Sequence, residues 1–175
     1  MKKISLFILI CTVFFTASCG GSASSGPEFT ECGENPVFPC ADAASGLVWS
    51  EKSPLSKVWN EAVFYCESLE EGGEKNWRLP DIDELRTLVQ DCYGTVKGGE
   101  CMVNTGCLVY DSCWSTFCKC EFDDSGKYSR FGDLGGLWSS SETGSEGAWY
   151  INFYEAKIID EDKENSYSVR CVSDI

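Results

Sequence analysis

Cysteines are the residues of this sequence with the greatest capacity for chemistry. The chain of 175 residues holds twelve cysteines and no histidine. Histidine is the most frequent general base and metal ligand in proteins, so its absence argues against the commonest catalytic and metal-binding arrangements. A thiol enzyme would need a free cysteine, and a structural zinc site would need closely spaced cysteine pairs. The chemistry open to this protein therefore depends on the state of its cysteines.

The N-terminus indicates the compartment. Lys2 and Lys3 precede the apolar run ISLFILICTVFFTA, which predicts a signal peptide over residues 1–18. The run ends in TASC, and the small residues before Cys19 resemble the lipobox of bacterial lipoproteins. We expect Cys19 to be acylated, and residues 19–31, rich in glycine and serine, to form a flexible tether. The alternative is ordinary secretion with cleavage nearby.

A lipoprotein signal also predicts a location and a partner. The lipid anchor would make the membrane itself a partner of this protein, in a bacterial cell envelope. Gly20, rather than an acidic residue, follows Cys19, which resembles the signal for outer-membrane sorting.

Export gives a meaning to the other cysteines. Setting Cys11 and Cys19 aside leaves an even number, which in an exported chain predicts disulfides rather than free thiols. A zinc site in CWSTFCKC is the alternative, but this spacing lacks the usual C-x-x-C pair. These ten cysteines are Cys32, Cys40, Cys66, Cys92, Cys101, Cys107, Cys113, Cys118, Cys120 and Cys171. Cys32 and Cys40 are near neighbours in sequence and are expected to pair, whereas Cys118 and Cys120 would form a strained ring.

The charge of the chain excludes some partners. The formal net charge is -14, so the surface repels phosphate backbones, and we expect no nucleic-acid partner. Oxygen donors that could hold calcium occur in FDDSGKYSRFGDLGG as Asp123, Asp124 and Asp133. Their spacing does not match an EF-hand loop, so we interpret them as solvated turn residues and expect no metal and no cofactor. Ser139, Ser140 and Ser141 are interpreted as strand residues, since no histidine is present to activate a hydroxyl.

Two helical segments are expected to position these residues. Trp59, Ala62, Val63, Cys66 and Leu69 form one apolar stripe at helical spacing, which Gly72 and Gly73 would end. Valine cannot cap a helix, so we expect this helix to begin at Ser56 rather than at Val58.

The segment NWRLPDIDEL predicts the start of the second helix. Asp81 would cap it, and Glu84 three residues later would complete a capping box. The buried stripe of this helix would contain Ile82, Leu85, Leu88 and Val89. Trp77, Leu79 and Pro80 are interpreted as a packing motif at the joint between the helices, with Arg78 in solvent or paired with a neighbouring acid.

The rest of the chain predicts strands and one long loop. Strands are expected within 46–50, 137–141, 148–154, 156–160 and 167–173, which with the helices gives an α+β domain over residues 32–175. Residues 92–136 lack any period and hold six cysteines, so we expect a long loop held by disulfides rather than by a core. Its aromatic residues either stack on a ligand or fill the space between the disulfides as a small second core. These candidate ligand-loop residues are Tyr110, Trp114, Phe117, Tyr128 and Phe131.

The order of these landmarks resembles a known family. GLVWS, WNEAVFYCESL, NWRLPDIDELRTL, WSSSE, AWYINF and a terminal VRCV, over about residues 46–173, are similar to the Lcl C-terminal domain family. The resemblance implies a C-type lectin-like fold, in which two helices flank a small twisted antiparallel sheet and a long disulfide-rich loop lies at one end. It also implies that the first helix is tied to the last strand by a disulfide between Cys66 and Cys171. The six cysteines from 92 to 120 would then form three local bridges, whose pairing stays open.

These observations lead us to expect a membrane-anchored exported lipoprotein with a non-catalytic domain for ligand binding or adhesion. The ligand would be a glycan or a protein. One alternative is a structural protein of the cell envelope without a ligand. Another is an enzyme, because the same broad fold hosts a thiol- and metal-dependent oxidase family, whose chemistry requires free thiols.

Overall fold

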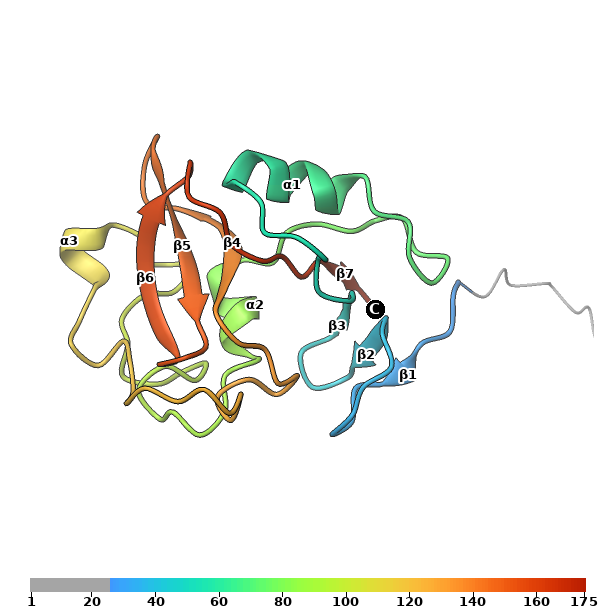
Figure 1. Ribbon diagram of the computed structural model, residues 1–175, viewed down its shortest axis with the longest axis horizontal. Coiled ribbons are helices and arrows are strands. Elements are labelled where there is room, and N and C mark those ends of the chain that lie inside the picture. The colour runs from blue at the N-terminus through green and yellow to red at the C-terminus, as the bar shows by residue number, and fades with distance from the viewer. Residues whose placement is uncertain (1–25) are drawn as a thin grey trace, which may run out of the picture.

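The computed structural model describes residues 26–175, and in them three helices accompany two small sheets (Figure 1). The expected signal peptide, the expected acylation site at Cys19 and most of the expected tether lie outside these residues. Within the described part of the chain, no helix has both the length and the apolar character needed to cross a membrane.

The strands form two sheets, and with the helices they confirm the α+β class. The family resemblance implied one small sheet, whereas the structure has two. The first sheet has the order β1-β2-β3-β7, with β1 (Thr30–Glu31) parallel to β2 (Cys40–Asp42) and the other neighbours antiparallel. It is completed by β3 (Leu47–Trp49) and β7 (Val172–Asp174). The second sheet is an antiparallel meander of β4 (Gly136–Glu142), β5 (Gly147–Asn152) and β6 (Lys157–Asp162).

The folded domain begins before residue 32. Thr30 and Glu31, expected in a flexible tether, pair with Cys40 and Ala41. Phe29 is half-buried against the core. This segment therefore belongs to the domain, and β1 lies at the end of the molecule opposite to helix α3 (Tyr110–Cys113) (Figure 1).

Helix α1 (Trp59–Glu67) begins later than Ser56, so that prediction was wrong. Its N-cap is Val58, whose side chain makes no capping hydrogen bond. Lys57 and Tyr167 exchange two backbone hydrogen bonds of 2.8 and 3.1 Å, which hold Lys57 in an extended conformation. The Trp59 N–H donates instead to the carbonyl of Lys163 at 2.9 Å. Tertiary contacts, rather than a local cap, therefore set the start of this helix.

Helix α2 (Ile82–Arg86) carries the predicted capping box. The Glu84 N–H donates to Asp81 Oδ1 at 2.8 Å, and the Asp81 N–H donates to Glu84 Oε2 at 2.8 Å. The helix has only five residues, so Leu88 and Val89 of the expected stripe lie beyond its end. Both are nevertheless buried.

Apolar side chains cover both faces of the strands. Trp149 and Ile151 of β5 pack in one cluster with Leu85 of α2. Ala148 and Tyr150, on the opposite face, pack in a second cluster with Ala62 of α1. Successive residues of β5 therefore point to two opposite faces, and both of these faces are buried.

The loop over residues 92–136 is not held by disulfides alone. Cys92, Cys101, Val103 and Cys113 are buried in the same cluster as the β5 side chains. The expectation of a loop without a core was therefore wrong, because its cysteines supply apolar surface to the main core as well as covalent links. The loop also contains α3, which its sequence pattern did not predict.

Candidate functional site

Disulfides fix the frame of the long loop. It contains three local bridges, Cys92–Cys120, Cys101–Cys118 and Cys107–Cys113. Elsewhere Cys66 of α1 pairs with Cys171, and Cys32 pairs with Cys40. All ten cysteines in the described residues are thus oxidised, which leaves no thiol there to act as a nucleophile or a metal ligand.

Backbone hydrogen bonds attach the same loop to the second sheet. The Ile158 N–H donates to the carbonyl of Cys118 at 2.8 Å, and the Cys120 N–H donates to the carbonyl of Glu155 at 2.7 Å. On the other side of the loop, the Trp149 indole N–H donates to the carbonyl of Leu108 at 3.0 Å. The loop is therefore fixed to the second sheet by hydrogen bonds as well as by its disulfides.

Exposed apolar side chains are concentrated in this long loop. Of the twelve exposed large hydrophobic residues in the described chain, seven lie between residues 92 and 122. Five of the seven are aromatic, so we call the whole set the aromatic loop residues: Tyr93, Met102, Val109, Tyr110, Trp114, Phe117 and Phe122. Only Tyr110, Trp114 and Phe117 were among the candidates from sequence, because an apolar residue in an aperiodic loop carries no signal of its exposure.

Three aromatic rings form a stack at α3. The Tyr110 ring lies between the buried Trp149, at a centroid distance of 6.1 Å, and Trp114, at 6.0 Å. The interplanar angles are 24° and 25°. Tyr110 and Trp114 remain 38% and 39% exposed, so each keeps surface available to solvent. Rings held in this way can stack on a flat apolar face of a ligand.

The other two candidate rings belong to the core. Tyr128 is buried, and its hydroxyl donates to the carbonyl of Glu121 at 2.8 Å. Phe131 is half-buried, with its ring 5.2 Å from that of Phe38 and 5.9 Å from that of Trp49. Tyr128 and Phe131 therefore fill space in the main core rather than in a separate second core, whereas Tyr110, Trp114 and Phe117 are exposed.

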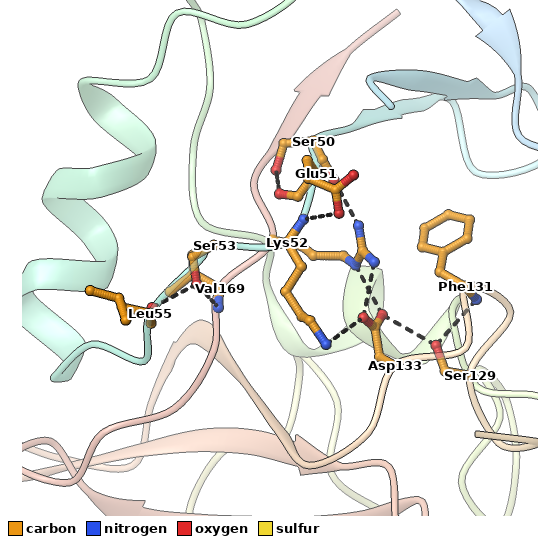
Figure 2. Close-up of polar contacts among 10 residues, drawn as sticks. Ser50, Glu51, Lys52, Ser53, Leu55, Ser129, Phe131, Asp133 and Val169 are labelled. Atoms are coloured by element: carbon orange, nitrogen blue, oxygen red, sulfur yellow. Dashed lines mark hydrogen bonds and ion pairs between the residues drawn. The ribbon is translucent and has the colours of Figure 1, made fainter. Parts of the chain in front are cut away.

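Asp133 is the centre of a buried polar network and not a solvated turn residue. Its carboxylate accepts two hydrogen bonds of 2.9 Å from the guanidinium of Arg170 and one of 3.2 Å from the Ser129 hydroxyl. Lys52 Nζ lies 3.5 Å from Asp133 Oδ1, and Figure 2 shows Asp133 between Lys52 and Ser129. Cations of the protein thus already neutralise this carboxylate, which makes it a poor ligand for calcium.

The other two calcium candidates do not form a metal site either, because Asp123 has protein partners and Asp124 is exposed. Asp123 accepts hydrogen bonds from the backbone and hydroxyl of Ser125 and pairs with Lys127 at 3.2 Å. These contacts, the Ser125 hydroxyl foremost, lower the pKa of Asp123 to about 2. Asp124 is exposed. In the described residues, no three acidic, cysteine or histidine side chains gather where they could hold a metal ion.

The three serines of β4 have structural contacts. The Ser139 hydroxyl donates to the carbonyl of Trp149 at 2.6 Å, and the Ser141 hydroxyl accepts from the Ile82 N–H at 3.0 Å. Ser140 donates its backbone N–H to the carbonyl of Pro80 at 2.8 Å. They connect β4 to β5 and to the start of α2, in keeping with their interpretation as strand residues.

Comparison with known proteins identifies the family of this chain. No curated protein matches the sequence closely enough to serve as a relative. The family model of the Lcl C-terminal domain matches residues 40–173, from β2 into β7, and so covers the second sheet, the first sheet apart from β1, the three described helices and the aromatic loop residues. The chain therefore belongs to the Lcl C-terminal domain family.

Proposed function

We propose that this protein is an exported, membrane-anchored lipoprotein whose domain binds a ligand through the aromatic loop residues without catalysing a reaction. The observation that carries the proposal is the exposed ring pair of Tyr110 and Trp114, held by stacking on the buried Trp149. Exposed apolar residues that are scattered singly need no explanation, whereas a group of them in one segment is typical of an interaction site.

A neutral glycan suits this surface best. Residues 92–122 contain two lysines and three acids, so they are nearly neutral on a chain whose formal net charge is -14. The apolar face of a sugar ring can stack on tyrosine or tryptophan without a charged partner. A protein ligand is the alternative, which an array containing both classes separates.

Three observations support the wider setting. A C-type lectin-like arrangement is supported by membership of the family and by the packing of α1 and α2 side chains in two different apolar clusters. The complete oxidation of the described cysteines supports an oxidising compartment and argues against thiol-dependent catalysis. β1 lies at the end of the molecule opposite to α3, so a chain anchored at Cys19 would enter the domain far from that helix (Figure 1).

The binding proposal is tested on a glycan and peptide array with the disulfides intact. We expect binding to neutral glycans, and a Trp114→Ala variant should bind the best glycan about tenfold more weakly, since one stacking contact is lost. Phe64→Ala is the matched control, because Phe64 is 69% exposed on α1 and lies outside the loop. Peptide binding alone would favour a protein ligand, and no binding at all would favour a structural envelope protein.

The anchor is tested separately. Replacement of Cys19 by serine should move the protein from the detergent phase to the aqueous phase, because the acyl chains provide its membrane affinity. Outer-membrane fractions should contain the wild-type protein. Unchanged partitioning of the variant would refute the lipoprotein assignment without affecting the binding proposal.

A further inference from the structure

A second candidate site lies outside the aromatic loop residues. A pocket of about 470 Å³ opens between the segment that joins β2 to β3, the end of α2 and residue 97 of the long loop. Its charged and hydroxyl-bearing lining residues are Asp42, Ser45, Arg86, Thr87, Lys97 and Arg130. Three cations and one acid thus meet in one pocket of a strongly acidic protein.

Arg86 supplies a buried charge without a carboxylate partner. Its side chain is only 2% exposed, and it forms no ion pair among the described residues. It donates instead to the backbone carbonyls of Thr95, Val96 and Val103. A guanidinium has five N–H groups, so these three bonds leave two free.

The environment of Arg86 disfavours its charge. Burial lowers the pKa of Arg86, and the nearby charge of Asp83 compensates this effect only in part. Buried charges in proteins are normally paired, because carbonyl dipoles replace only part of the lost hydration. An anion in the pocket would supply the missing countercharge.

The only acid in the pocket lining is already neutralised. Asp42 accepts hydrogen bonds of 2.9 and 3.2 Å from the two terminal nitrogens of Arg130, and one of 2.6 Å from the Ser45 hydroxyl. The excess positive charge therefore belongs to Arg86 and Lys97. Lys97 is exposed and has no ion pair in the described part of the chain, so its ammonium is available at the rim.

We propose that this pocket binds the carboxylate of a small monoanionic ligand, with Arg86 as the buried countercharge and Lys97 as the second cation. A planar carboxylate matches the planar fork of a guanidinium. The net charge of -14 opposes the approach of any anion, and it opposes a dianion more strongly than a monoanion. The site shares no residue with the aromatic loop residues, so it does not depend on the glycan proposal.

Nuclear magnetic resonance of the ¹⁵N-labelled protein with intact disulfides tests this site. The probes are sodium acetate, neutral acetamide of the same shape, and sodium sulfate, at constant ionic strength maintained with sodium chloride. Acetate should cause saturable shifts of the backbone amides of Arg86, Thr87, Lys97 and Arg130, whereas acetamide should not. Sulfate should bind more weakly than acetate.

Two lysine variants with the same change of charge supply the specificity control. Lys97→Gln should weaken acetate binding about fivefold, in line with the loss of one exposed charge pair. Lys75→Gln should leave the affinity unchanged, because Lys75 is exposed and outside the pocket. Both variants retain Arg86, whose three carbonyl contacts the fold needs. Absence of saturable shifts with acetate, equal shifts with acetamide, tighter binding of sulfate, or equal weakening by both variants would overturn the proposal.

Discussion

Arg78 and Glu84 form a two-pronged ion pair, with Nη1 to Oε2 and Nη2 to Oε1 distances of 2.7 Å each. Glu84 Oε2 also accepts the Asp81 N–H of the capping box, and Arg78 Nη2 reaches Asp174 of β7 at 2.9 Å. Hydrogen bonding to Glu84 is the main cause that raises the pKa of Arg78. The corner formed by residues 77–80 is therefore architectural, because its arginine connects the start of α2 to the last strand.

We predict that Arg78→Lys lowers the free energy of unfolding by about 1 kcal/mol. A lysine cannot form the two parallel hydrogen bonds, and the loss is modest because the side chain of Arg78 is 42% exposed. Equilibrium unfolding in urea measures the change. Lys75→Gln, which removes the exposed pair with Glu70, should change stability much less; equal losses would show that the two-pronged geometry contributes nothing.

The bridge between Cys66 and Cys171 should be the disulfide with the largest effect on stability. It joins residues 105 positions apart, for which the loss of chain entropy predicts about 4–5 kcal/mol as an upper value. The double variant Cys32→Ala, Cys40→Ala opens a loop with a separation of 8 and should lose about 2–3 kcal/mol. Unfolding in urea compares it with Cys66→Ala, Cys171→Ala. Peptide mapping without reduction should also recover Cys66 joined to Cys171, and a reversed order of stability would contradict the prediction.

Breaking the buried pair of Asp133 and Arg170 should be costly. Arg170 is 3% exposed, and its guanidinium lies 4.3 Å from the ring centroid of Phe38. Asp133→Leu would leave this cation without its carboxylate, and we expect a loss of about 3–5 kcal/mol. The double variant Asp133→Leu, Arg170→Met removes both charges and should recover part of the loss. A double variant as unstable as the sum of the single variants would show that charge pairing is not the cause.

Asp42 should contribute to stability only above moderately acidic pH. Burial alone would raise its pKa, but the hydrogen bonds from Arg130 and Ser45 outweigh it and lower the pKa below the ordinary value of 3.8. The stabilisation is therefore complete above pH 3.8 and is lost as the pH falls through the lower pKa of the folded state. The advantage of the wild-type protein over Asp42→Asn, measured by unfolding in urea, should shrink in that acidic range.

Asp160 should show the opposite dependence of stability on pH, because its pKa is raised in the folded state. Burial, with a smaller effect of Glu161, raises the pKa of Asp160 in the folded state, so its ionisation destabilises the fold as the pH rises through 3.8 and beyond. Asp160→Asn should therefore gain stability relative to the wild type over the same rise in pH. Parallel pH profiles for the two variants would refute the assignment whose expected direction they contradict.

Much of the fold could be predicted because its signals are local. The capping box of Asp81 and Glu84 joins residues three positions apart, and the strand positions follow from alternation along short segments. The aperiodic segment from residue 92 was recognised as a loop by its glycines and cysteines. These features depend on neighbours in sequence, which are the same in any arrangement of the elements.

The rest was decided by partners distant in the chain. The sequence by itself determined the presence of two helices, most of the strands, the even set of ten cysteines after residue 19 and the acidic composition. Only the tertiary structure decided that α1 starts after Lys57, since that residue pairs with Tyr167. It also placed Asp133 against Arg170 and left Tyr110 and Trp114 exposed while burying Tyr128. The physical reason is that burial and pairing depend on which surfaces meet in space, and local residue types do not encode this.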